Sequence, residues 1–460
     1  MLNRIIRKRL WRLKNKFMGD DPLVSQLTAG TESLQQELRY LRRELACSQA
    51  ALLEAGKPQG GGDMSRKKIC FVALYPYSLF NPKTGFVFGG SEVRTWLFST
   101  GLAANTQHEI SFVVFDHGQY PVETHQNVRV YAHSFYKTFM PVPSLPPVEG
   151  DWQAAKIGDE IITEERLAVY QRVNADVYIV PGVNNLSAEV TAFCQRERKM
   201  MVLVLGSDID LSDVFYEGSQ ESTNYGARGD WGYYVLSHAD LILSQTETQS
   251  ARLKDKFHRG SVIVKNPIDL SHFAKPPLQD GARPMVLWVG KSDTVKRPEI
   301  CLALAAQYPQ YAFELIMNRS NEAIFEKVLQ EAPPNVKIIE RVPFDEIETY
   351  FARARVFVNT SVFEGFPNAF LQAGKYGVPV LSLQVDPDGL IGENRCGIMT
   401  DGNLQQLHAG LKKLMEDNEF HQICSANIKR YVHENHGLAG RVQELDQAIA
   451  AVGDVRRQGR

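Results

Sequence analysis

Two lysines follow an apolar run in the second half of the sequence. The segment VLWVGKSDTVKRPEI places Lys291 directly after Gly290 and Lys296 five positions later. A strand ending at the glycine would bring both ammonium groups to one edge of a sheet. Fixed cations at such a place can stabilise negative charge that develops on a ligand during a reaction. Two solvated surface lysines would show the same spacing, so the pair needs support from other motifs.

A second segment, SVFEGFPNAFLQAGKYGVPVLS, places an acid and a helix start after another apolar run. Glu364 ends the run, and a helix is predicted to begin near Pro367 or Asn368, since proline suits the first turn of a helix. Free backbone N–H groups at such a start bind anions, and a diphosphate is the natural guest. The predicted anion-binding turn consists of Gly365, Phe366, Pro367, Asn368, Ala369 and Phe370. Gln372 lies further along the helix, where it can reach a pair of hydroxyl groups such as those of a ribose.

Two further candidates lie in the first half of the chain. Gly89 and Gly90 follow the apolar run KKICFVALYP and precede a helix expected to be capped by Ser91. Adjacent glycines let a backbone approach a ligand closely, but their spacing is not that of a dinucleotide-binding loop, which disfavours a dehydrogenase. Asp208 follows the run VLVLG and can orient or deprotonate a hydroxyl group. An aspartate after a strand also serves as a turn former or helix cap.

The elements that must position these residues are read from apolar runs that alternate with helical stretches. One series runs from KKICFVALYP to ADLILSQ, and a second runs from PMVLWVGK to VPVLSL. Continuous apolar runs of this kind predict parallel strands covered by helices on both faces. The sequence therefore predicts an α/β fold with two doubly wound domains that join near 265–284. Ligands are expected in a crevice at the carboxyl ends of both sheets.

The order and spacing of these motifs resemble those of the retaining glycosyltransferase family four, within glycosyl transferases group 1, from about Lys67 to the final helix. The resemblance implies the GT-B fold and a nucleotide-sugar donor. It implies that Lys291 and Lys296 clasp the donor diphosphate, that Glu364 contacts the transferred sugar, and that Gly89 and Gly90 lie near the phosphate and the acceptor. Gln372 stands where the family usually has a second acid that binds ribose, which indicates an altered grip or an altered nucleotide preference.

The resemblance implies transfer of a hexose with retention of anomeric configuration, and no metal and no cofactor are expected. The basic amphipathic start of the chain suggests a saccharide or lipid-linked acceptor at a membrane, and with it synthesis of cell-surface polysaccharide or lipopolysaccharide. Two alternatives stay open. One is a GT-B phosphorylase or epimerase, and the other is a non-catalytic scaffold that keeps a degenerate donor site.

Composition excludes several other classes. The 51 Lys and Arg residues nearly balance the 53 Asp and Glu residues, so no bulk field draws the chain to nucleic acid. The six cysteines are scattered without the paired spacing of a zinc site or disulfide framework, which favours a reducing cytoplasm. No stretch approaches the roughly 20 apolar residues of a membrane-spanning helix.

The beginning of the chain differs from the rest. Residues 1–18 carry seven basic and no acidic residues in a helical apolar pattern. This pattern predicts a helix on an anionic membrane, with a solvated tail or a docking helix as the alternatives. Leucines across 27–52 follow a heptad and predict a short coiled coil that joins copies of the chain, or a helix packed on the body. The location predicted is cytoplasmic, with attachment to the inner face of the cell membrane as an alternative.

The predicted segments therefore run as follows: a basic amphipathic helix (1–20), a coiled coil (21–56), a linker (57–66), a Rossmann-like acceptor domain (67–268), a Rossmann-like nucleotide-sugar domain (269–435), and a final helix that crosses back with a tail (436–460).

Overall fold

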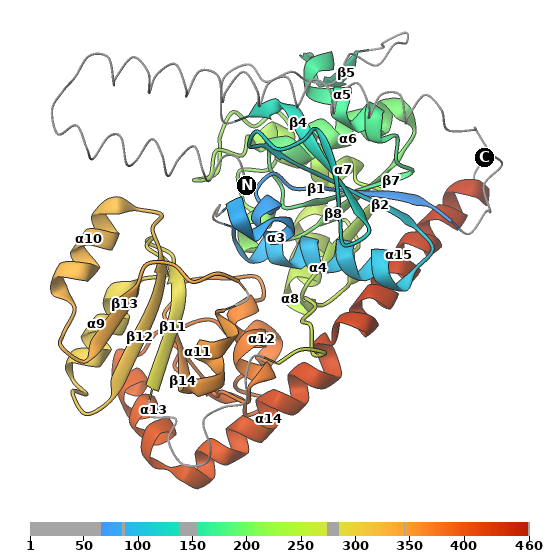
Figure 1. Cartoon of the computed structure of the whole chain (residues 1–460). Helices are drawn as coiled ribbons and strands as arrows, with labels where there is room; N and C mark the ends of the chain where they lie inside the picture. Colours follow the sequence, from blue (N-terminus) through green and yellow to red (C-terminus); the bar gives the residue numbers. More distant parts are fainter. Residues whose placement is uncertain (1–65, 85–87, 138–153, 274–284, 345, 459–460) are drawn as a thin grey trace, which may run out of the picture.

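A computed structural model describes residues 66–84, 88–137, 154–273, 285–344 and 346–458 of the chain (Figure 1). The predicted basic helix and coiled coil, and with them the predicted membrane and self-association segments, lie outside the described residues. Of the predicted linker, only Arg66 is described.

The first domain contains an eight-stranded sheet in the order β10-β9-β8-β7-β1-β2-β4-β3. Neighbouring strands are parallel except for β3, which runs antiparallel to β4 at the edge. The strands are β1 (Lys68–Val72), β2 (Glu109–Asp116), β3 (Val122–His125), β4 (Val128–Lys137), β7 (Val177–Pro181), β8 (Met200–Val204), β9 (Leu241–Ser244) and β10 (Val262–Ile263). A separate hairpin pairs β5 (Ala155–Ile157) with β6 (Glu160–Ile162).

The second domain contains a six-stranded parallel sheet in the order β13-β12-β11-β14-β15-β16. Its strands are β11 (Met285–Lys291), β12 (Ala312–Asn318), β13 (Val336–Ile339), β14 (Ala354–Asn359), β15 (Val380–Ser382) and β16 (Gly397–Met399). This is the doubly wound order: β12 and β13 are added on one side of β11, and β14, β15 and β16 are added on the other. Ligands bind at the carboxyl ends of the strands where the strand order switches in this way.

Apolar runs become central strands because both of their faces are covered. In β1, Ile69 and Phe71 pack into one apolar cluster, whereas Cys70 and Val72 pack into the cluster on the opposite face. This alternation with period two is the geometry of a strand buried between two layers. The expectation of two doubly wound α/β domains is thus confirmed.

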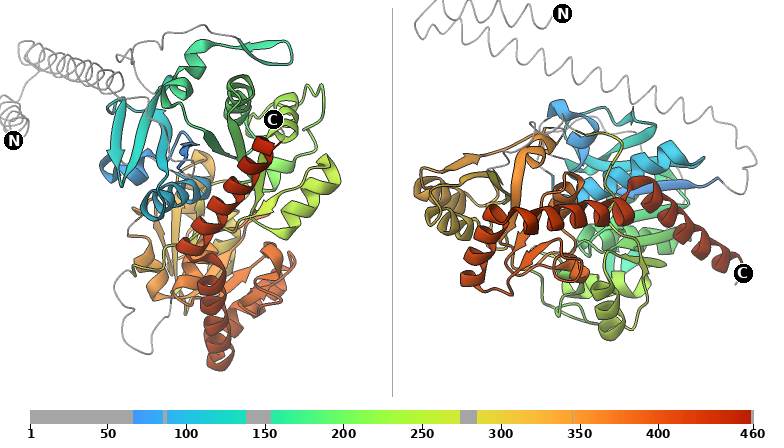
Figure 2. Two further views of the ribbon diagram at one scale, coloured as in Figure 1. Left: turned by 90° about the vertical axis from the view of Figure 1, so that its right-hand side faces the viewer. Right: turned by 90° about the horizontal axis from the view of Figure 1, so that it is seen from below.

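Helices surround both sheets (Figures 1 and 2). In the first domain they are α3 (Tyr77–Phe80), α4 (Gly90–Asn105), α5 (Glu164–Val173), α6 (Asn185–Glu197), α7 (Gly229–His238) and α8 (Glu247–Phe257). In the second domain they are α9 (Pro298–Ala306), α10 (Glu322–Glu331), α11 (Glu348–Arg353), α12 (Asn368–Lys375), α13 (Leu404–Glu416) and α14 (Asn418–His436). Among the described residues, no helix has the length and apolar character needed to cross a membrane.

The last helix, α15 (Leu438–Gln458), leaves the second domain and returns to the first (Figures 1 and 2). Its Val442, Leu445 and Ile449 are buried in an apolar cluster of the first domain. At its start, Ile268 N–H donates to His436 O at 2.8 Å and Leu438 N–H donates to Ile268 O at 3.0 Å. The chain therefore crosses between the domains twice, and the two crossings are hydrogen-bonded to each other.

Helix α12 packs closely against α14, and a glycine allows this contact. An ideal Cβ at Gly374 would lie 2.4 Å from Val432 Cγ2 and 3.1 Å from the carbonyl oxygen of Ile428. We expect Gly374→Ala to lower the free energy of unfolding by about 1–3 kcal/mol, because the extra methyl overpacks this contact.

The control is Gly440→Ala in α15, where the added methyl meets no heavy atom within 4 Å beyond its chain neighbours and the backbone of its own helix. This change is expected to raise the free energy of unfolding by up to about 1 kcal/mol through helix propensity. Urea denaturation followed by circular dichroism measures both. Equal effects of the two substitutions would contradict the packing argument.

Candidate active site

A cavity of about 680 Å³ lies between the two domains. Its walls come from the loop after β1 and the start of α4 in the first domain, and from the loops after β11 and β14 in the second. All predicted site residues line it except Asp208 and Phe370, namely Gly89, Gly90, Gly290, Lys291, Lys296, Glu364, Gly365, Phe366, Pro367, Asn368, Ala369 and Gln372. Segments nearly 300 positions apart in the sequence thus meet in one cavity.

The two lysines and the acid lie together at one end of this cavity. Lys296 forms an ion pair with Glu364, which also accepts a hydrogen bond of 2.8 Å from Ser361 Oγ. The Lys291 ammonium nitrogen would lie 3.8 Å from an ideal Cβ at Gly89. Lys291 therefore faces the glycine loop of the first domain, and both lysines line the cavity. An anion in this part of the cavity would meet positive charge from the second domain.

The glycine loop starts helix α4 somewhat earlier than expected. The helix begins at Gly90 and Gly89 is the capping residue, whereas Ser91 was the predicted cap. The Glu92 side chain replaces a capping side chain, because its Oε2 accepts from Gly89 N–H at 2.9 Å. Because Gly89 and Gly90 have no side chains, their backbone can lie against the second domain. There Asn368 Nδ2 donates to Gly90 O at 2.7 Å.

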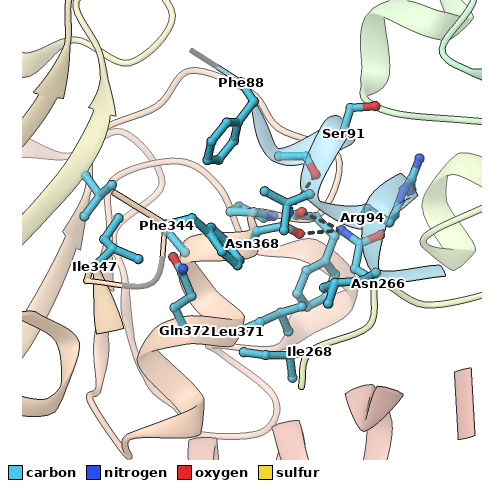
Figure 3. A pocket seen from close by; sticks show the side chains of 18 of the residues that line it. Phe88, Ser91, Arg94, Asn266, Ile268, Phe344, Ile347, Asn368, Leu371 and Gln372 are labelled. Carbon is cyan, nitrogen blue, oxygen red and sulfur yellow. Dashed lines mark hydrogen bonds between the residues drawn. The ribbon is translucent and has the colours of Figure 1, made fainter. Parts of the chain in front are cut away.

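Asn266 joins both domains at the floor of the cavity (Figure 3). Its Nδ2 donates to Phe366 O at 3.0 Å and to Asn368 Oδ1 at 3.1 Å. Its Oδ1 accepts from Arg94 Nη1 at 3.1 Å, and its main-chain oxygen lies 2.7 Å from His436 Nδ1. We call these five residues the Asn266 junction. It connects α4, the first crossing, the start of α12 and the end of α14.

Arg94 is a member of this junction that the sequence analysis missed. It is only 2% exposed and donates from Nη2 to Leu205 O at 2.8 Å. Burial lowers its pKa to about 10, with Asp210 and Glu92 acting in the opposite direction, so the guanidinium is charged at neutral pH. A signal was present, because Arg94 falls among the apolar positions Val93 and Leu97 of an otherwise ordinary amphipathic helix.

Two predicted site residues lie elsewhere. The N–H of Phe370 was expected to be free for an anion but donates to Pro367 O at 3.0 Å, and its side chain is fully buried. Asp208 lies in the 3₁₀ turn Asp208–Leu211, does not line the cavity, and pairs with Arg252 at 3.2 Å. Burial raises its pKa, partly offset by Arg252. The cap of this turn is Ser207, and the catalytic role of Asp208 stays a prediction.

The neighbouring Asp210 is a structural acid. It is 4% exposed and accepts from Val183 N–H at 2.8 Å and from the N–H groups of Gly206 and Ser207 at 2.5 and 3.1 Å. Burial raises its pKa, and the three backbone hydrogen bonds act against this shift. Asp210 thereby fixes the loop that ends β8.

The second domain meets the first through further contacts around the cavity. Asp388 accepts from Glu247 N–H at 3.0 Å, which caps the start of α8 with a side chain from the other domain. Phe344 packs against Phe88 and Trp96, with ring centroids 5.9 and 5.8 Å apart. Sequence patterns do not indicate these contacts, because each one pairs residues from different domains.

A known protein family matches the second domain. Residues 283–417 match the family model described as "Glycosyl transferases group 1". This region is a group 1 glycosyl transferase domain. It holds Lys291, Lys296 and Glu364, together with the start of α12.

Two curated relatives match parts of the chain. An uncharacterised glycosyltransferase of Haemophilus influenzae is 21% identical over 222 residues, which is 46% of this chain and 62% of the relative. Glycosyltransferase 1 domain-containing protein 1 of Xenopus tropicalis is 29% identical over 101 residues, 22% of this chain and 29% of the relative. The match thus spans less than two thirds of either relative.

Solved structures cover more of the chain and have the same fold. Sucrose-phosphate synthase from Thermosynechococcus elongatus has a TM-score of 0.65 at 15% identity, over 85% of this chain and 100% of that one. HepE of Anabaena, solved with UDP-glucose, has a TM-score of 0.61 at 13% identity, over 84% and 100%. The catalytic domain of Arabidopsis thaliana starch synthase IV has a TM-score of 0.59 at 11% identity, over 84% and 99%. The two domains of this chain therefore have the GT-B fold.

The burial of His436 predicts a pH dependence of stability. Burial lowers its pKa to about 3, whereas an unfolded histidine titrates near its ordinary value. Unfolding below about pH 6.5 therefore takes up a proton, and the free energy of unfolding falls by up to about 1.4 kcal/mol per pH unit as pH decreases through this window. Denaturation midpoints measured between pH 7 and pH 4 check the slope.

His436→Asn keeps a donor near Asn266 O but cannot titrate, so its slope is expected to be shallower by about 1 kcal/mol per pH unit. His238→Asn, at an exposed position of α7, is the control. A slope for His436→Asn that equals that of the unmodified protein would show that His436 is not the group responsible.

Proposed function

We propose that this protein is a retaining hexosyltransferase that moves a sugar from a nucleotide-sugar donor to a saccharide or lipid-linked acceptor without a metal ion. The proposal is carried by one observation: Lys291, Lys296, Glu364 and the start of α12 line one cavity between the two domains. All of these residues belong to the group 1 domain. Such a cavity offers fixed positive charge for a diphosphate and a carboxylate for sugar hydroxyl groups.

In this proposal, the diphosphate lies between the two lysines and the N–H groups of Asn368 and Ala369. It competes with Glu364 for Lys296, since these two side chains pair in the structure. Donor binding then frees the Glu364 carboxylate to accept hydrogen bonds from the sugar. Lys296 then binds the diphosphate and Glu364 binds the sugar hydroxyl groups. The lysine's positive charge stays where the leaving phosphate develops negative charge.

The reaction proposed breaks the bond between the anomeric carbon and the β-phosphate oxygen, and the electron pair leaves with the phosphate. An acceptor hydroxyl entering beside Gly89 and Gly90 forms the new bond on the same face, which retains configuration. Its proton passes to the leaving phosphate oxygen, so no side-chain base is required. Asp208 has no part in this step.

The acceptor and location are proposed from the sequence. Residues 1–18 favour an acceptor at an anionic membrane and a role in cell-surface polysaccharide or lipopolysaccharide synthesis, and residues 27–52 favour self-association. Among the described residues, five cysteines are buried and form no disulfide, namely Cys70, Cys194, Cys301, Cys396 and Cys424. Thiols that stay reduced suit a reducing compartment, which agrees with the cytoplasmic location that we propose.

Replacement of Lys296 tests the charge mechanism. We expect Lys296→Ala to lower kcat about 100-fold or more, because the leaving phosphate loses a fixed cation. Release of nucleoside diphosphate from a nucleotide sugar measures the effect. Lys327→Ala is the control, since the Lys327 side chain is 65% exposed on α10. Full activity of Lys296→Ala would refute the mechanism.

Nucleotide binding in the presence of a chelator tests metal independence. Two of the similar structures contain UDP-glucose and ADP, so UDP, GDP and ADP are suitable probes. We expect one of them to raise the melting temperature equally with EDTA and with magnesium. Ligand at about 100 times its Kd stabilises a folded protein by about 2.7 kcal/mol. Stabilisation only with magnesium would contradict this claim, and no response to any probe would favour the scaffold.

A further inference from the structure

A buried ion pair forms part of the cavity wall away from Lys291 and Lys296. The Lys375 side chain is 2% exposed, and its ammonium lies 2.6 Å from Glu348 Oε1. The hydroxyl of Tyr376 donates to Glu348 Oε2 at 2.7 Å. Glu348 begins α11 and Lys375 ends α12, so the pair ties these helices together. Both residues line the cavity.

The position of this pair follows from the geometry of α12. Asn368, Leu371, Gln372 and Lys375 have the spacing of one helix face, and all four line the cavity. Figure 3 shows Asn368, Leu371 and Gln372 along this wall. Seven residues of a helix span about 10 Å. A ligand with its diphosphate at the start of α12 therefore extends toward Lys375 with its nucleoside.

The group that this end of the cavity offers is a carboxylate. Lys375 is covered by its surroundings, including the Phe273 ring, whose centroid lies 5.1 Å from Nζ. Glu348 keeps 23% of its side chain exposed. A carboxylate has about four acceptor sites, and Lys375 and Tyr376 account for one on each oxygen. Hydrogen-bond acceptors on Glu348 thus stay available to a ligand.

Resting on the proposed function, we infer that Glu348, held by Lys375 and Tyr376, accepts hydrogen bonds from the nucleoside of the donor. The donors of these hydrogen bonds are ribose hydroxyl groups or N–H groups of the base. Gln372 lies one helical turn from the start of α12 and carries an amide. In this inference the acid that binds the nucleoside is Glu348 of α11, and Lys375 of α12 holds its carboxylate in place.

A purely structural tie between α11 and α12 is the competing interpretation. Charged pairs taken from water lose much of their solvation, and an apolar pair of similar size often joins two helices as well. Both partners of this ion pair line the cavity, and Glu348 is the more exposed of the two. A structural tie predicts that loss of Glu348 affects stability alone, whereas a nucleoside contact predicts a change in which nucleotides bind.

The test is calorimetric titration of the full chain with UDP, GDP and ADP, and with the 2′,3′-dideoxy form of the nucleotide that binds most tightly. For ribose contact, we expect the unmodified protein to bind the ribonucleotide about ten-fold more tightly than its dideoxy form, as for loss of a hydrogen bond to a charged group. Glu348→Gln is expected to lose most of this difference, because a neutral amide accepts a hydrogen bond more weakly than a carboxylate. For base contact, the dideoxy form binds as tightly as the ribonucleotide, and Glu348→Gln reduces the preference among the three bases instead.

The control is Glu346→Gln, an exposed glutamate two positions earlier that does not line the cavity. The readout is a ratio of affinities within one protein, so a lower folded fraction does not alter it. If Glu348→Gln does not fold, Glu348→Asp keeps the charge near Lys375 and withdraws the carboxylate by one methylene, with the same loss of preference expected. Unchanged ratios in a folded variant would overturn the inference. Failure of the unmodified protein to bind any nucleotide would refute the proposed function itself.

Discussion

The arrangement of the cavity depends on the hydrogen bonds of Asn266. This side chain is 3% exposed, and a buried amide must satisfy its polar atoms within the protein. Its partners are Arg94 in the first domain, and Phe366 and Asn368 in the second. Because one amide serves both domains, a shift of either domain at this point breaks several hydrogen bonds together. The relative position of the glycine loop and the start of α12 is thereby fixed.

The electrostatics of the cavity follow from this arrangement. Lys291, Lys296 and the start of α12 give one end a positive potential, and Glu348 gives the other end an acceptor. Gly365 allows the domains to meet, because an ideal Cβ there would lie 2.6 Å from Gly206 O. A ligand that fits is anionic at one end and carries hydrogen-bond donors at the other. A nucleoside diphosphate sugar has this pattern.

Local sequence patterns were sufficient for the central strands and for most of the site. Runs such as VLWVG are buried on both faces of the sheet, so their apolar composition alone identifies them as strands. The residues that follow such strands must then lie at the carboxyl edge of the sheet. The edge strand β3 was not predicted, because Val122–His125 is short and only half buried, and its neighbour β4 was not predicted either. The segments 1–20 and 21–56 stay predictions.

Side-chain partners could not be read from local patterns. Asp208 and Asp210 are two positions apart after the same strand, and only the fold shows that Asp210 is buried and that Asp208 pairs with Arg252. Whether the N–H of Phe370 is free or hydrogen-bonded depends on the exact first residue of α12. Sequence predicts that residue only to within one or two positions. The role of Glu348 depends on Lys375, which lies 27 positions away on another helix.

The most direct test of the central claim, that one nucleotide sugar is bound by both domains at the Asn266 junction, is amide hydrogen exchange with and without saturating ligand. The account predicts slower exchange at 88–92 in the first domain and at 364–369 in the second, with no change in the distant helix α10. Protection confined to one domain, or absent from both segments, would contradict it.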